Sequence, residues 1–173
     1  MNKMMIGIAA GVVLNVWASL AGRGSFLHHV AVLGATVWIG LPLLVLGGVA
    51  FVIGRRKASP RLLSGAAWLL LTGMVVASSL ISLIPGRRSA NADISAAQRC
   101  CEEAASRLEE VKARTGLYPT NLPPSTASLP RLLNGHAFFW SDGTNYQFTF
   151  PDPTGIMDMF GFDNGNKKWQ KWD

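Results

Sequence analysis

The chain has 173 residues, of which 49% are hydrophobic and only 15% charged, and its formal net charge is +6. A typical soluble domain has roughly 25% charged residues, so this composition argues against a protein exposed to water throughout. Residues 1–86 contain Lys and Arg but no Asp or Glu, whereas cations and acids balance in residues 87–173. The positive charge therefore accompanies the apolar half. Nucleic-acid binding, which calls for surplus cations on the polar half, is not expected.

Three apolar stretches in the first half, at about 4–21, 26–53 and 62–84, predict transmembrane helices. Each approaches or exceeds the roughly 20 residues that a helix needs to cross ~30 Å of hydrocarbon. Only helices satisfy the backbone polar groups of single spans in lipid. Pro85-Gly86 is expected to end the third helix. The sequence thus predicts a membrane anchor over residues 1–86.

The connections between these stretches predict the orientation of the anchor. The second connection, at 54–61, carries Arg55, Arg56, Lys57 and Arg61. Loops dense in Lys and Arg stay in the cytoplasm. We therefore expect a multi-pass protein of a bacterial inner membrane, with everything after Ile84 periplasmic. A second interpretation of the first stretch is a secretory signal cleaved after Ala21, which leaves the orientation of the second half unchanged.

The predicted spans carry little chemistry of their own. They contain no Asp, Glu, Lys or Arg, which argues against an ion pathway or an ion-coupled transporter. Gly7 and Gly11 form a GxxxG pattern, which lets helix backbones approach closely. We expect these glycines to pack helices within one chain, with homo-oligomer formation as the alternative.

Residues 87–173 predict a small extracytoplasmic α+β domain. Apolar residues spaced three and four apart predict an amphipathic helix from about Asp93 to Arg114, capped by Asp93 or Ser95. Aromatic residues alternate with polar ones from Tyr146 to Phe150, as in a half-buried strand. Further strands are expected near 138–140, 156–162 and 167–172. The expected fold is this helix packed on a three- or four-stranded antiparallel meander. The residues of the predicted helical stripe are Ile94, Ala97, Cys101, Ala104, Leu108 and Val111.

The end of the predicted helix carries a short motif, Thr115-Gly116-Leu117-Tyr118-Pro119. A helix closed in this way and followed by an aromatic antiparallel sheet resembles the extracytoplasmic domain of type IV pilin-like proteins, with type II secretion pseudopilins as the nearest match. The resemblance implies a pilin-like fold after residue 88 and a role in an envelope assembly or secretion apparatus. The third span lacks the Gly-Phe-x-x-x-Glu segment of filament subunits, so we expect an anchored pilin-like domain rather than a polymerising subunit.

No combination of residues predicts catalysis or a cofactor. We find no nucleophile paired with a base and no phosphate-binding loop, so we expect no enzyme, no catalytic residue and no cofactor. His28-His29 lacks the further ligands that a metal needs. Residues 163–166 are interpreted as a turn, with the calcium site of some pseudopilins as the minor alternative. Cys100 and Cys101 are interpreted as packing residues, with an intermolecular disulfide through Cys100 as the alternative.

The best candidate for a contact surface is the end of the sequence, where cations and tryptophans alternate. Its residues are Lys168, Trp169, Lys171 and Trp172. Such a mixture suits a protein interface or a layer of lipid headgroups. We expect a protein partner in the envelope, membrane lipid around the anchor and no nucleic acid. The alternative function is a membrane-anchored sensor or toxin-immunity protein that binds a ligand or effector through the same domain.

Overall fold

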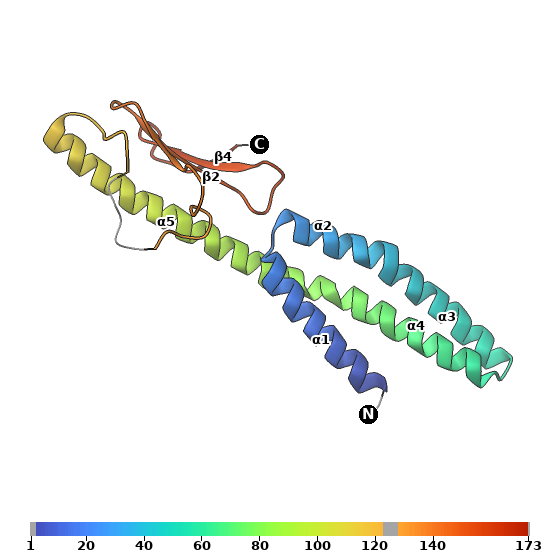
Figure 1. The fold of residues 1–173 in the computed structure, drawn as a ribbon. Helices are drawn as coiled ribbons and strands as arrows, with labels where there is room; N and C mark the ends of the chain where they lie inside the picture. Colours follow the sequence, from blue (N-terminus) through green and yellow to red (C-terminus); the bar gives the residue numbers. More distant parts are fainter. Residues whose placement is uncertain (1–2, 123–127, 173) are drawn as a thin grey trace. The chain divides into compact units, whose positions relative to one another are not determined.

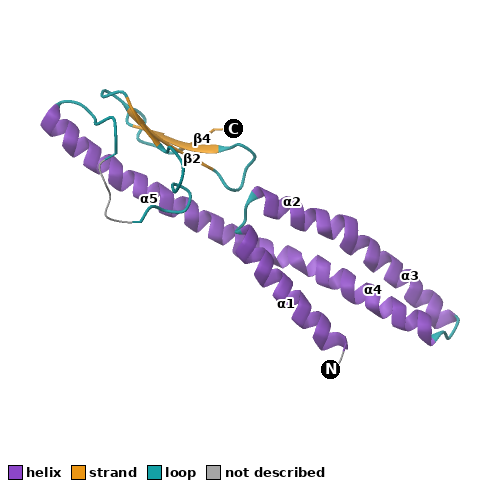
Figure 2. Cartoon of the chain, viewed as in Figure 1, coloured by secondary structure: helices purple, strands orange, loops and turns teal. Residues whose placement is uncertain are grey.

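The computed structural model describes residues 3–122 and 128–172, and the chain divides into two compact units, 1–88 and 89–173. Figure 1 shows the elements in chain order, and Figure 2 shows that the strands are confined to the second unit. The first unit contains helices only. Its elements are α1 (Lys3–Gly22), α2 (Phe26–Ala35), the π-helical η1 (Thr36–Gly40), α3 (Leu41–Arg56), α4 (Pro60–Ser78), the 3₁₀ segment η2 (Ser79–Ser82) and the start of α5 (Leu83–Thr115).

Two helical runs are long and apolar enough to cross a membrane. They are Phe26–Arg56, with 31 residues, and Pro60–Thr115, with 56 residues. The helix α1 has 20 residues, and its described apolar stretch is Ala9–Gly22. The second and third predicted stretches are thus confirmed as helices with the length and composition of a membrane span. Among the described residues two helices meet this description, and not the three that were predicted.

Pro85 and Gly86 do not end a helix, contrary to the prediction, since α5 runs from Leu83 to Thr115. The 3₁₀ segment η2 precedes α5 and places Pro85 in its first turn, where a missing N–H breaks no intrahelical hydrogen bond. Gly86 is buried, and an added Cβ would lie 2.9 Å from Cε1 of His28. Gly86 therefore allows the start of α5 to pack against the side chain of His28 in α2.

The π-helical segment η1 lies just before Pro42. Pro42 sits in the first turn of α3, and the wider turn of a π segment accommodates a proline without interrupting the helix. The run from Phe26 to Arg56 is accordingly continuous.

Small residues line the contact between the two long runs. An added Cβ at Gly47 would lie 2.9 Å from Cγ of Leu70. Glycine and alanine at a spacing of seven let two helices pack closely along their length. This seam was not predicted from the sequence, where only Gly7 and Gly11 of α1 were expected to pack helices. Its buried residues are Gly40, Gly47 and Gly54 on one run, and Ala66 and Gly73 on the other.

The second unit contains the remainder of α5 and an antiparallel sheet in the order β1-β2-β3-β4. The predicted small four-stranded meander is confirmed. The alternation predicted for β2 holds, and Phe148 pairs with Phe139 on one side and Phe162 on the other. The strands are β1 (Phe139–Ser141), β2 (Tyr146–Pro151), β3 (Met159–Asp163) and β4 (Gln170–Trp172).

The core of the second unit lies between the sheet and one stripe of α5. Leu108 and Phe148 are completely buried at its centre. Asp93 does not cap a helix, because α5 begins ten residues earlier. Its carboxylate instead lies 3.3 Å from Nε of Arg131. The buried residues of the stripe are Ala97, Cys101, Ala105 and Leu108, of which the predicted pattern omitted Ala105.

Candidate interaction site

The four residues proposed as a contact surface lie on and beside β4, and the structure divides them. Trp169 packs into the core, with its ring centroid 5.4 Å from that of Phe150 and 5.3 Å from that of Phe162. Its indole N–H donates to Oε1 of Glu102 at 2.9 Å. Lys168, in contrast, is exposed. Of the two tryptophans, Trp169 thus belongs to the core of the second unit.

Lys171 is engaged within the domain. Its Nζ lies 2.7 Å from Oδ2 of Asp158 and 3.0 Å from Oδ2 of Asp152. Hydrogen bonds to these two carboxylates raise the pKa of Lys171. Burial alone would raise the pKa of Asp152, but hydrogen bonds from Thr154 and Lys171 outweigh it and lower that pKa. We call this arrangement of Lys171, Asp152 and Asp158 the lysine clamp.

The lysine clamp fixes the loop between β2 and β3. The backbone N–H of Asp152 donates to the carbonyl of Asp158 at 2.8 Å, closing the base of the loop. Oδ1 of Asp152 accepts from the backbone N–H and the hydroxyl of Thr154, at 2.8 and 2.7 Å. At the tip, Ile156 is 63% exposed and Met157 93% exposed, with φ +63 at Met157. Two large apolar side chains are thus held in solvent by a well-bonded loop.

The strand predicted over residues 156–162 is wrong for its first three positions. β3 begins at Met159. The turn-forming run Pro153-Thr154-Gly155 was the local signal for a loop. The two methionines had looked like the start of an apolar strand.

Trp172 extends the apolar surface of the loop onto the sheet. Met159 pairs with Pro151 on one side and with Trp172 on the other. The indole of Trp172 covers Gly161, since an added Cβ there would lie 2.6 Å from Cζ2. We call Ile156, Met157, Met159 and Trp172 the apolar tip.

The motif that closes α5 has a local structural role. Gly116, at φ +83, ends the helix in the left-handed conformation that glycine adopts without strain. The hydroxyl of Thr115 donates to the carbonyl of Val111 at 2.9 Å. Tyr118 is buried, its hydroxyl donates to Glu109 at 3.1 Å, and Pro119 then directs the chain away from the helix.

A small recess lies beside the motif on the same unit. Its volume is about 200 Å³, below the ~300 Å³ at which small-molecule pockets begin. Nζ of Lys167 lies 3.7 Å from Oε1 of Glu109 at its edge. Burial, followed by the charge of Glu109, raises the pKa of Tyr146 to about 12. The recess is lined by Glu102, Ala105, Ser106, Glu109, Tyr146, Phe162 and Lys167.

The two cysteines differ in access. Cys101 is fully buried, and burial raises its pKa to about 12, with the charge of Glu102 acting in the same direction. Cys100 is half-buried, and burial raises its pKa as well. Both thiols are free. Their position on α5 leaves Cys100 as the more accessible sulfur.

The first unit contains the remaining residues that the sequence singled out, the glycines of the GxxxG pattern and the His28-His29 pair. Gly7 of α1 faces Leu71 of α4, and an added Cβ on Gly11 would lie 3.4 Å from Oγ of Ser78. His28 is buried: its Nδ1 accepts from the N–H of Gly24 at 3.2 Å and its Nε2 lies 3.0 Å from Oγ of Ser82. Within residues 3–122 and 128–172, no group of three or more His, Cys, Asp and Glu side chains is placed to hold a metal.

Comparison of the chain with protein-family models, with curated proteins and with solved structures gives no match. The resemblance to pseudopilins therefore rests on the motif and on the order of the elements.

Proposed function

We propose that the chain is a membrane-anchored envelope protein whose second unit binds another protein through the apolar tip. The observation that carries the proposal is the exposure of Ile156 and Met157, at 63% and 93%, on a loop that the lysine clamp fixes. Exposed apolar side chains on an otherwise well-packed small domain mark contact sites. A loop fixed before binding loses little conformational entropy when a partner covers it.

The chemistry of the apolar tip defines the kind of partner. The two carboxylates nearest to the tip are paired with Lys171, so the tip presents apolar surface without a free charge at its base. Methionine and tryptophan are enriched at the centres of protein interfaces. We propose a partner with an apolar depression, into which Met157 and Ile156 insert while Trp172 covers the rim.

The membrane supplies the context of this contact. The excess of Lys and Arg between Arg55 and Arg61 supports a cytoplasmic position for that turn and a periplasmic position for residues 89–173. A helix ended by Thr115-Gly116-Leu117-Tyr118-Pro119 and packed on a meander supports a pilin-like domain. On this basis we propose a role in an envelope assembly or secretion apparatus.

Site-specific photo-crosslinking in native membranes tests the proposal. A photoreactive amino acid at Met157 should give one discrete protein adduct, and the same group at Glu110, exposed on α5, should not. Adding Lys171→Ala to the Met157 probe should reduce the adduct severalfold, because the loop is no longer held. Equal adducts from both positions, or an adduct insensitive to Lys171→Ala, would contradict a contact through the fixed tip.

A further inference from the structure

The second unit contains two Asn-Gly pairs, Asn134-Gly135 and Asn164-Gly165. When glycine follows asparagine, the side-chain amide is easily attacked by the next backbone nitrogen, because glycine has no Cβ to hinder the approach and its backbone is free to turn. The two pairs have the same sequence, so a difference in their reactivity reports on their surroundings. The structure places them in different surroundings.

Hydrogen bonds hold both groups of Asn164-Gly165 that would react. The backbone N–H of Gly165 donates to Oδ1 of Asp163 at 2.9 Å. The side-chain oxygen of Asn164 accepts from the backbone N–H of Tyr146 at 3.1 Å, and its Nδ2 donates to Oδ1 of Asn145 at 3.5 Å. Asn164 is also half-buried. Its Cγ can therefore reach the nitrogen of Gly165 only after these hydrogen bonds have broken.

Asn134-Gly135, in contrast, is open. Both residues are exposed, at the end of a turn over residues 131–135. Within residues 3–122 and 128–172, no hydrogen bond engages the side chain of Asn134 or the backbone N–H of Gly135. An added Cβ on Gly135 would have nothing within 4 Å, and its φ of +79 is a conformation that glycine adopts without strain. The reacting groups of this pair are free to turn toward each other.

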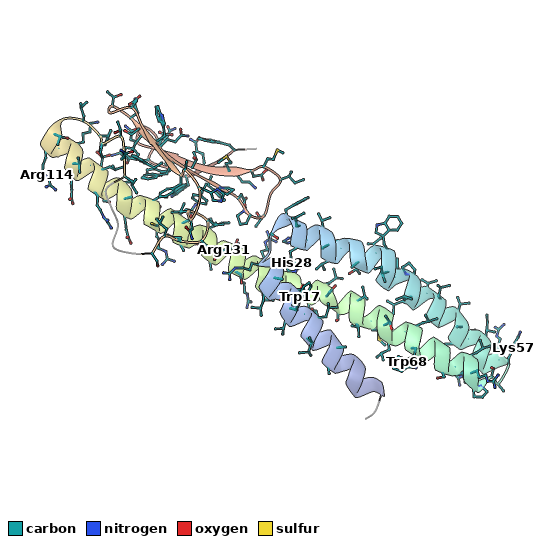
Figure 3. The ribbon with its side chains drawn as sticks, viewed as in Figure 1. Trp17, His28, Lys57, Trp68, Arg114 and Arg131 are labelled. Carbon is teal, nitrogen blue, oxygen red and sulfur yellow. The ribbon has the colours of Figure 1, made fainter. Side chains whose placement is uncertain are left out.

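The residues just before this pair are fixed in the second unit. Leu132 and Leu133 are buried in its core. Arg131, labelled in Figure 3, has its Nε 3.3 Å from Oδ2 of Asp93. A covalent change at Asn134 therefore alters an exposed turn and leaves the packing of the core in place.

We propose that Asn134 is a site of spontaneous deamidation in the folded protein and that Asn164 is protected from this reaction. The backbone nitrogen of Gly135 loses its proton to the solvent and attacks Cγ of Asn134. The Cγ–Nδ2 bond breaks, and Nδ2 takes up a proton and leaves as ammonia. Water then opens the cyclic imide. Cleavage of the bond from the glycine nitrogen to Cγ gives aspartate at position 134, and cleavage of its bond to the backbone carbonyl carbon gives isoaspartate.

The modification changes the surface charge of the second unit as the protein ages. Water is the only co-reactant, and either product carries a new carboxylate. Because ammonia is lost to the solvent, the reaction is irreversible and the products accumulate. The proposal depends neither on membrane insertion nor on the partner of the apolar tip.

The test incubates the full-length protein in detergent under mildly alkaline conditions, which favour loss of the amide proton. Samples are digested with trypsin and analysed by mass spectrometry. Both pairs lie in one tryptic peptide, residues 132–167, which has no internal Lys or Arg, so fragment ions assign the mass change to either asparagine in the same peptide. Deamidation should be at least about tenfold faster at Asn134 than at Asn164, where hydrogen bonds on both reacting groups must break first.

Two comparisons separate structure from sequence. In the same protein unfolded in guanidinium chloride, the two asparagines should deamidate at similar rates. In the folded protein, Asp163→Ala removes the acceptor of the Gly165 N–H and should speed deamidation at Asn164 severalfold. Asn134→Gln is the matched control, which should abolish the product at position 134 and leave the rate at Asn164 unchanged.

The proposal would be overturned if folded wild-type protein gave no product at Asn134, or gave equal or faster deamidation at Asn164. A preference for Asn134 that persisted after unfolding would show that the flanking sequence, and not the structure, sets the rates. If Asp163→Ala left Asn164 as slow as in the wild type, the protection of that site would be refuted. None of these results bears on crosslinking at Met157, so the two proposals fail independently.

Discussion

Lys171 of β4 and Asp152 at the end of β2 form an ion pair of 3.0 Å, although Asp152 is only 5% exposed. The pair joins the edge strand of the sheet to the loop that carries the apolar tip. A buried carboxylate depends on its partner, because an uncompensated charge away from water is costly. The stability of the second unit and the presentation of the tip are therefore linked through one lysine.

Replacing that lysine should destabilise the second unit. Lys171→Ala leaves Asp152 and Asp158 unpaired, and the expected loss is about 1–3 kcal/mol, less than for a fully buried pair because Lys171 is 43% exposed. Chemical denaturation of the full-length protein in detergent, followed by near-UV circular dichroism, measures the change. Lys168→Ala removes an exposed lysine nearby and should stay within about 0.5 kcal/mol of the wild type. Similar losses in the two variants would contradict the lysine clamp.

The lysine clamp should also make the second unit sensitive to acid. The pKa of Asp152 is lower in the folded state than in the unfolded chain. Its contribution to stability is therefore present above the unfolded pKa of about 3.9 and disappears as the pH falls through the folded value. The free energy of unfolding should decline below about pH 4.5. Asp152→Asn should flatten this decline, measured by denaturation at a series of pH values. Some loss of stability in acid should remain in this variant because of Asp142. Hydrogen bonds from Asn145 and Thr144 lower the pKa of Asp142 to about 2, so it also stabilises the folded state less as the pH falls. An acid limb unchanged in Asp152→Asn would contradict the assignment.

The core stripe of α5 gives a prediction on folding. Leu108 has no exposed surface, so Leu108→Asp would bury a carboxylate without a partner and should cost about 3–5 kcal/mol. We expect the second unit of this variant to lose its resistance to limited proteolysis. Arg107→Asp places the same carboxylate on the exposed side of the helix, one residue away, and should remain resistant. A resistant Leu108→Asp would show that the stripe does not face the core.

Two adjacent glycines test the seam between the helical runs. An added Cβ on Gly47 would lie 2.9 Å from Cγ of Leu70, whereas nothing lies within 4 Å of one on Gly48. Gly47→Leu should therefore force the helices apart at a cost of about 1–3 kcal/mol. Gly48→Leu should be nearly neutral. Thermal unfolding in detergent distinguishes them, and equal transition temperatures would contradict close packing at Gly47.

The features that sequence analysis predicted correctly are those that local periodicity determines. The stripe through Leu108 and the alternation from Tyr146 to Phe150 repeat over several turns or residues, so their period identifies the element without knowledge of its partners. The helix stop at Gly116 follows from backbone conformation alone.

The features that could not be predicted from the sequence depend on contacts with residues far away along the chain. Pro85 was expected to end a helix. Because the 3₁₀ segment η2 precedes it, Pro85 lies in the first turn of α5, where its missing N–H breaks no intrahelical hydrogen bond. Ile156 and Met157 appeared to belong to a strand, because nothing local reveals that Lys171 closes the loop. The alternation over residues 167–172 did not disclose which tryptophan faces the core, since the two faces differ only in what packs on them.

Reporter fusions at the carboxyl terminus test the central claim, a membrane anchor that places a folded binding domain outside the cytoplasm. The account predicts that a reporter active only in the periplasm will be active when fused after Asp173, and that one active only in the cytoplasm will be silent. The opposite pattern would contradict the orientation on which the proposed envelope partner depends.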